Sequence, residues 1–173
     1  MAALAIGADV SPPSLRSGLR NPFPGGTMAG YAGDTGLDIS GFKKPVFAIA
    51  SGTVDYSEWG HTLWRGPKDT AFCIRVTLDK PIPFLDGRVS GKITHVYYAH
   101  LSALEFTQAE TAVDKRHVSA GEKLGTSGIA NGSPHLHVGL LLDGQVERDD
   151  FKFILTEAEV RKVLGDYKPG EKI

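Results

Sequence analysis

The sequence predicts a mostly β protein, an antiparallel β-sheet or sandwich with one short helix near the C-terminus. Three patterns support this prediction: short apolar runs bounded by glycines, two longer runs rich in β-branched and aromatic residues, and a helical pattern confined to the end of the chain. The chain has 173 residues, of which 41% are hydrophobic, which suffices for one continuous core.

The first 29 residues are interrupted by prolines and glycines before any periodic pattern develops, and we expect an extended arm there. From Gly36 onward, short apolar runs at residues 37–39, 45–50 and 52–56 predict short strands. These runs open the main folded unit, which we place at residues 30–150.

The two longest strand candidates are residues 71–78 and 92–101, and an Asp86-Gly87 turn signal lies between them. We expect the two to pair as a long hairpin. Pro81 and Pro83 cannot donate ladder hydrogen bonds, so the tip of this hairpin is expected to be irregular.

The remaining elements follow in order along the chain. Residues 109–115 carry a weak helical signal, residues 118–125 predict a turn and a strand, and residues 135–142 predict a further strand. In the last unit, residues 151–173, a helix is expected from Thr156, a capping hydroxyl followed by acidic residues, to about Leu164.

The overall charge excludes some classes of partner. The 19 Lys and Arg residues nearly balance the 20 Asp and Glu residues, which argues against nucleic acid or an anionic membrane as partner. The one cysteine, Cys73, lies in an apolar run and is expected to be a buried thiol. We see no secretory leader and expect no membrane span.

Three local patterns contain residues suited to chemistry. His135 and His137 are two apart in a predicted strand, so their side chains share a face and can bind a metal or transfer protons. Asp34 and Asp38 flank a glycine turn, and His100 ends an apolar strand. Each pattern alone is more often an ordinary turn, a strand end or a solvated strand face than a functional site.

Together and in this order, the patterns resemble the lysostaphin-type peptidoglycan endopeptidases, which carry His-x-x-x-Asp, Tyr-x-His-Leu and Pro-His-Leu-His motifs. Tyr98-Ala99-His100-Leu101 and Pro134-His135-Leu136-His137 match closely. The resemblance covers residues 30–150, and it implies the family's duplicated hybrid motif fold.

The resemblance also implies roles for individual residues. Asp38 and His137 would be zinc ligands, and His100 and His135 would be the catalytic histidines that orient or deprotonate the attacking water. This sequence departs from the family at the first ligand, where Asp34 replaces a histidine. A carboxylate there is shorter and reduces the net charge of the site, so Zn²⁺ is expected to bind weakly or to be absent.

Other residues of the predicted site are less sharply defined. His61 lies where the family has a loop near the cleft, and we place it in the substrate groove together with Tyr98. His95 has the opposite strand parity to His100, so the two share a face only if a bulge intervenes. His117 belongs to a charged turn and receives no role.

Two functions follow from these patterns. The first is a metal-dependent endopeptidase that hydrolyses peptide bonds in peptidoglycan at the cell wall, in the periplasm, outside the cell or on a particle. The alternative is a catalytically degenerate wall-binding or structural subunit of a phage-tail-like or other envelope assembly, for which Asp34 argues. A phosphocarrier-like role is less well supported, because it has no use for Asp38.

Overall fold

The computed structural model describes residues 11–30, 32–61, 66–144 and 154–173. In these ranges the chain forms one nine-stranded antiparallel sheet followed by a short helix, which confirms the predicted fold class. The strands are β1 (Thr27–Met28), β2 (Leu37–Ser40), β3 (Pro45–Phe47), β4 (Gly52–Trp59), β5 (Phe72–Leu85), β6 (Ser90–Leu104), β7 (His117–Val118), β8 (Lys123–Ala130) and β9 (Ser133–Leu142), and the helix is α1 (Glu157–Gly165).

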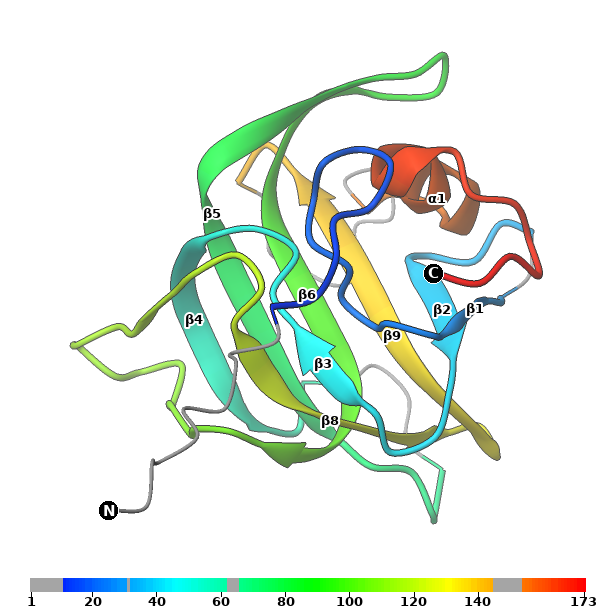
Figure 1. Cartoon of the computed structure of the whole chain (residues 1–173). Helices are drawn as coiled ribbons and strands as arrows, with labels where there is room; N and C mark the ends of the chain where they lie inside the picture. The colour runs from blue at the N-terminus through cyan, green and yellow to red at the C-terminus, as the bar shows by residue number, and fades with distance from the viewer. Residues whose placement is uncertain (1–10, 31, 62–65, 145–153) are drawn as a thin grey trace, which may run out of the picture.

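The sheet is built around the predicted hairpin of β5 and β6, whose far end projects beyond the other strands (Figure 1). The strand order is β1-β2-β9-β8-β6-β5-β4-β7, with β9 also paired to β6 and β3 paired to β8. The pairing register shifts between Thr77 and Ile82, next to Pro81, as expected where a proline interrupts the ladder.

A second irregularity in β6 determines which face of the sheet carries His100. Phe72 pairs with Leu101 and Ile74 pairs with Tyr98, so two residue steps on β5 oppose three on β6. This is the arrangement of a β-bulge, in which one extra residue is inserted and the following side chains change face. His100, inside the bulge, has a φ of 64°.

The two faces of the central strands differ in character. One face supplies apolar side chains such as Val76, Tyr98 and Leu140 to the main core. The other face carries a small cluster of Tyr56, Cys73 and Ala99, with Cys73 fully buried as expected. The candidate site lies on this second face.

The chain on both sides of residues 30–150 packs into the same core. Phe23 and Met28 of the arm, and Val160 and Leu164 of α1, are buried with the strand residues. The helix begins at the predicted cap, because Thr156 accepts a hydrogen bond from the Glu159 amide and Glu159 accepts one from the Thr156 amide.

The weak helical signal of residues 109–115 does not correspond to a helix, because these residues form turns and bends. Hydrogen bonds from Gln108 and Lys115 fix this loop to β4, where the Gln108 amide nitrogen donates to the Val54 carbonyl and Lys115 donates to the Asp55 carbonyl. In the ranges described above, no helix is long and apolar enough to cross a membrane.

Candidate functional site

The pairing of β2 with β9 brings the first site residues together. Asp38 stands opposite His137, and Ser40 stands opposite His135. Residues directly opposite in an antiparallel pair have side chains on the same face. The Asp38 carboxylate therefore meets the His137 ring, and Oδ1 accepts a hydrogen bond from Nδ1 at 2.8 Å.

His135 lies beside this pair and is held by its own strand. Its Nδ1 is 2.9 Å from the Ser133 carbonyl oxygen, which can only accept, so Nδ1 carries the hydrogen. In the neutral ring Nε2 then keeps its lone pair, and this atom is 3.6 Å from Asp38 Oδ1. The free lone pair of His135 thus faces the carboxylate of Asp38.

The bulge in β6 adds His100 to the group. Its ring centroid is 5.1 Å from that of His135 and 5.8 Å from that of His137. His100 Nδ1 is buried and has no hydrogen-bond partner among the described residues. Burial first, and then the charges of His137 and His135, lower the pKa of His100 to about 4, so the ring is neutral at neutral pH.

The charge state of Asp38 is set by opposing effects. Burial, the largest single effect, raises the pKa of this carboxyl. The hydrogen bond from His137 and the charges of the three histidines together outweigh burial, so the pKa of Asp38 lies below its usual value. At neutral pH the site therefore combines one carboxylate with a neutral His100, a set able to attract a cation and to accept a proton.

A divalent metal fits two of the predicted ligands. Zinc bonds of about 2.0–2.2 Å in a tetrahedral site place ligand atoms about 3.3 Å apart. Asp38 Oδ1 and His137 Nδ1 already face each other at 2.8 Å, so a small opening admits an ion between them.

Asp34, the third predicted ligand, is arranged differently. Its Oδ1 accepts a hydrogen bond from the Thr35 amide at 2.9 Å, and its carbonyl accepts one from the Glu157 amide of α1. Asp34, Asp38 and His137 do not bring one ligand atom each within 4.8 Å of one another. The third position is therefore not preformed by Asp34.

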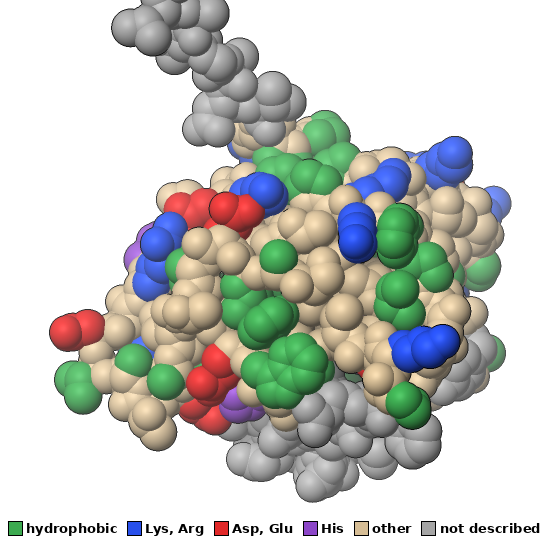
Figure 2. Space-filling view, turned by 90° about the horizontal axis from the view of Figure 1, so that it is seen from below, with side chains coloured by type: hydrophobic (Ala, Val, Ile, Leu, Met, Phe, Trp, Pro, Cys, Tyr) green, Lys and Arg blue, Asp and Glu red, His purple; other side chains and the backbone are tan. Residues whose placement is uncertain are grey.

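Among the described residues, one group brings three possible ligand atoms within 4.8 Å of one another. It consists of Glu58, His61 and Glu110, which the sequence analysis does not combine. His61 Nε2 is 2.8 Å from Glu58 Oε1, and Arg75 reaches Glu110 at 3.2 Å. Because Arg75 already supplies a positive charge, the cluster is explained by ion pairing. On the face drawn in Figure 2, a histidine side chain borders acidic side chains near the lower edge of the view.

The two predicted groove residues lie in different surroundings. His61 stacks on Tyr56 with ring centroids 3.7 Å apart, and its carbonyl accepts a hydrogen bond from the Tyr97 hydroxyl. Tyr97 also contacts His137 edge to face at 6.3 Å. Tyr97 thus contacts both His61 and His137 and links the two, and the sequence analysis does not identify this residue.

Tyr98 requires a correction. It is 1% exposed in the main core, and its hydroxyl accepts a hydrogen bond from the Ile49 amide at 2.9 Å. A side chain so deeply buried cannot line a groove. Residues two apart share a face in a regular strand, but the bulge in β6 breaks that alternation, so Tyr98 faces the core while His100 faces the site.

The same bulge places His95 on the face of the site. His95 Nε2 is 3.7 Å from Asp55 Oδ2, and Asp55 also pairs with Arg75 at 2.7 Å. Arg75 stands opposite Tyr97 in the register of β5 and β6. A row of paired polar groups therefore continues from the histidines along the sheet.

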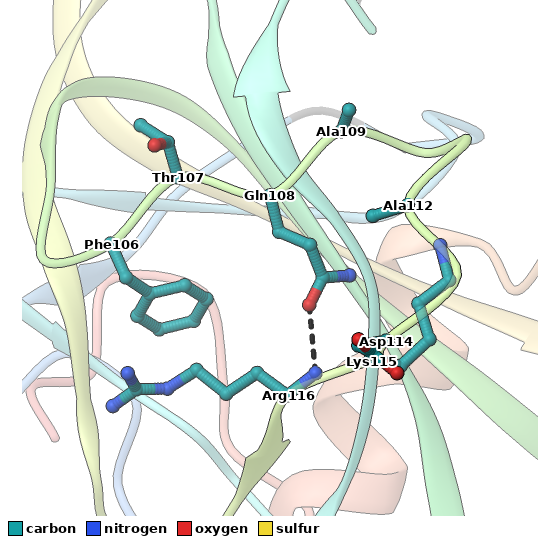
Figure 3. Close-up of a pocket in the computed structure, with 8 residues that line it drawn as sticks. All are labelled: Phe106, Thr107, Gln108, Ala109, Ala112, Asp114, Lys115 and Arg116. Atoms are coloured by element: carbon teal, nitrogen blue, oxygen red, sulfur yellow. Dashed lines mark hydrogen bonds between the residues drawn. The ribbon is translucent and has the colours of Figure 1, made fainter.

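A pocket is lined by residues of the loop 106–116, and none of these lining residues is a histidine (Figure 3). Gln108 crosses this pocket and accepts a hydrogen bond from the Arg116 amide at 2.8 Å. His117, to which the sequence analysis gives no role, lies on the surface with its Nε2 atom 2.7 Å from Asp79 Oδ2. We assign no chemistry to either place.

No family model and no curated protein sequence matches the chain, whereas solved structures of similar fold exist. A candidate M23 peptidase from Pseudomonas aeruginosa aligns with 91% of this chain at 19% identity and a TM-score of 0.52. The antimicrobial peptidase lysostaphin from Staphylococcus simulans aligns with 86% of this chain at the same identity and TM-score. In each case 53% of the other chain is covered, so this chain spans about half its length. The likeness shows that the fold is that of these peptidases.

Proposed function

We propose that the protein is a metal-dependent endopeptidase that hydrolyses peptide bonds of bacterial cell-wall peptidoglycan. The observation that carries this proposal is the convergence of His100, His135, His137 and Asp38 from three strands onto one face. The motifs of these residues and the shared fold of two peptidases support a cell-wall peptide as the substrate.

In this proposal Asp38 and His137 hold a divalent cation, and Asp34 completes the ligand set by turning its carboxylate away from the Thr35 amide. Zn²⁺ with three protein ligands and an open position supplies hydroxide near neutral pH, because it lowers the pKa of bound water to about 7. A set with two carboxylates also favours harder cations such as Mn²⁺ more than a histidine-rich set does.

In this proposal the two remaining histidines, His100 and His135, act as general base and general acid. His100 is neutral above a pH of about 4 and is close to the pair, so it can accept a proton from the attacking water. In its neutral form His135 has a lone pair on Nε2, because Nδ1 donates its hydrogen to the Ser133 carbonyl. Protonated in turn, these rings stabilise the oxyanion of the tetrahedral intermediate.

A second candidate function is favoured by the position of Asp34. Because Asp34 does not complete a preformed three-ligand group, the chain is also compatible with a degenerate module that binds wall peptides or serves as a subunit of an envelope or tail-like assembly. Such a protein would keep the histidine face for binding and would have no use for a metal.

Metal content and turnover distinguish the two functions. We expect about one metal ion per chain in the wild type, measured by elemental analysis after purification without chelators, together with release of peptides from purified cell wall. The Asp38→Ala/His137→Ala variant should lose both, and the Asp34→His variant should bind zinc more tightly. Metal in the Asp34→His variant alone, with no turnover by the wild type, would overturn the enzymatic proposal and support the binding module.

A further inference from the structure

The backbone of His100 is strained and must be held in place. Its φ of 64° lies in the left-handed region, which residues other than glycine seldom adopt. Such a conformation persists only where the surrounding contacts determine it. His100 belongs to the bulge that turns its ring toward His135 and His137, so whatever holds this backbone also places the ring.

The contact that holds it comes from Thr70, which precedes β5. The Thr70 hydroxyl donates a hydrogen bond to the His100 carbonyl oxygen at 2.8 Å. The same oxygen atom of Thr70 accepts one from the Ile129 amide at 2.9 Å, and the Thr70 amide donates to the Ile129 carbonyl at 2.8 Å. Thr70 is therefore fixed on β8 by its own backbone, and its hydroxyl is aimed at the strained residue.

Gly128 provides the space for this contact. A Cβ atom on Gly128 would lie 2.6 Å from the His100 carbonyl oxygen and would overlap the Thr70 hydroxyl oxygen. Neither neighbour is the free end of a long side chain, so neither can move aside at low cost. The absence of a side chain at residue 128 is thus required for Thr70 to reach His100.

We infer that Thr70 is a positioning residue for His100. Its hydroxyl fixes the direction of the His100 carbonyl, and this keeps the left-handed turn that brings the imidazole next to His135. Thr70 touches neither a substrate nor a metal in this role. The inference rests on the proposed function only where catalytic rate is concerned, because the placement of the ring can be measured separately.

The test compares Thr70→Val, which keeps the shape but removes the donor, with Thr70→Ser, which keeps the donor. In NMR spectra of the full-length protein, the nuclear Overhauser contact between the rings of His100 and His135 should be lost in Thr70→Val and retained in Thr70→Ser. The ring signals of His117, on the exposed pair with Asp79, serve as an internal control for the folded state. A retained contact in Thr70→Val would overturn the inference.

Rate measurements on purified cell wall give a second readout. Misplacing a reacting group costs roughly 10- to 100-fold in rate, so we expect a loss of this size in Thr70→Val and its restoration in Thr70→Ser. Equal losses in both variants would contradict a role for the hydroxyl. If the wild type itself does not cleave cell wall, the proposed function fails, while the ring contact still decides the role of Thr70. Thr70→Ala replaces Thr70→Val in both measurements if the valine variant does not fold.

Discussion

Gly36 lies directly against the imidazole ring of His137. A Cβ atom on Gly36 would be 2.5 Å from His137 Nε2 and 2.9 Å from the Val138 carbonyl oxygen. The backbone oxygen cannot move without breaking the ladder, so a Gly36→Ala variant must displace the ring. We expect it to lose metal and to fall about 100-fold in the rate of wall hydrolysis, since such a rate loss follows from an ångström-scale shift of a reacting group.

Gly33 provides the matched control for this variant. Both glycines have a positive φ, 78° at Gly36 and 86° at Gly33, but no atom of the described residues lies within 4 Å of a Cβ on Gly33. Gly33→Ala should therefore carry the backbone strain, about 1–2 kcal/mol of unfolding free energy, without the loss of metal and rate. Similar rates in the two alanine variants would show that strain, and not the His137 contact, determines the effect.

The low pKa of His100 predicts how stability depends on pH. Its value is about 4 in the folded protein against an ordinary value of 6.5. Between these pH values the unfolded chain binds a proton that the folded protein does not. Stability should therefore decrease as the pH falls from 6.5 to 4, and His100 alone should contribute about 3 kcal/mol to this decrease.

Urea denaturation at a series of pH values tests this, with His100→Asn as the control, because asparagine tolerates a left-handed backbone. The variant should show a shallower dependence in this window. A residual slope of the same sign is expected from His95, whose pKa is also lowered by burial. Parallel curves for the wild type and His100→Asn would mean that His100 titrates normally.

The burial of Tyr98 predicts a variant that separates stability from activity. Tyr98→Phe removes the hydroxyl oxygen that accepts a hydrogen bond from the buried Ile49 amide, and an unsatisfied buried donor costs about 1–3 kcal/mol. Thermal or urea unfolding should detect this loss, while hydrolysis measured well below the melting temperature remains unchanged. A slower rate at unaltered stability would instead place Tyr98 in the substrate groove.

The capping box of α1 predicts a purely structural effect. Thr156→Ala removes the side-chain acceptor of the Glu159 amide, and loss of such a cap typically costs about 1 kcal/mol. Thr156→Ser keeps the acceptor and should unfold at nearly the wild-type urea concentration. If the two variants were equally destabilised, packing of the threonine methyl group would account for the effect instead of the cap.

Most of the fold could be predicted from local sequence patterns, whereas Asp38, His100, His135 and His137 could be grouped because the order of their motifs resembles that of the lysostaphin-type endopeptidases. Alternation with a period of two placed His135 and His137 on one face, and the flanking apolar runs located β2 and the hairpin of β5 and β6. These predictions hold because side-chain direction in a regular strand depends on nothing beyond residue parity.

The failures have a common physical cause in departures from regular geometry. The bulge at His100 contains no glycine that would indicate it in the sequence, and the burial of Tyr98 in the core therefore could not be predicted. The loop at residues 109–115 has residues that tolerate a helix, but tertiary hydrogen bonds to β4 select turns. Thr70 lies 30 positions from His100 in the sequence, and no local pattern could join the two.

Because β6 contains an extra residue, the position of the His100 ring depends on the number of residues between Tyr97 and Leu101 as much as on their identities. Deleting Ala99 would move the histidine back by one position, about 3.3 Å along the strand, into the place opposite His137 that alanine now fills. Adding a residue would turn Leu101 out of the core. In any future alignment of relatives, a gap within residues 97–101 would therefore mark a chain whose site is rearranged, even where every histidine is present.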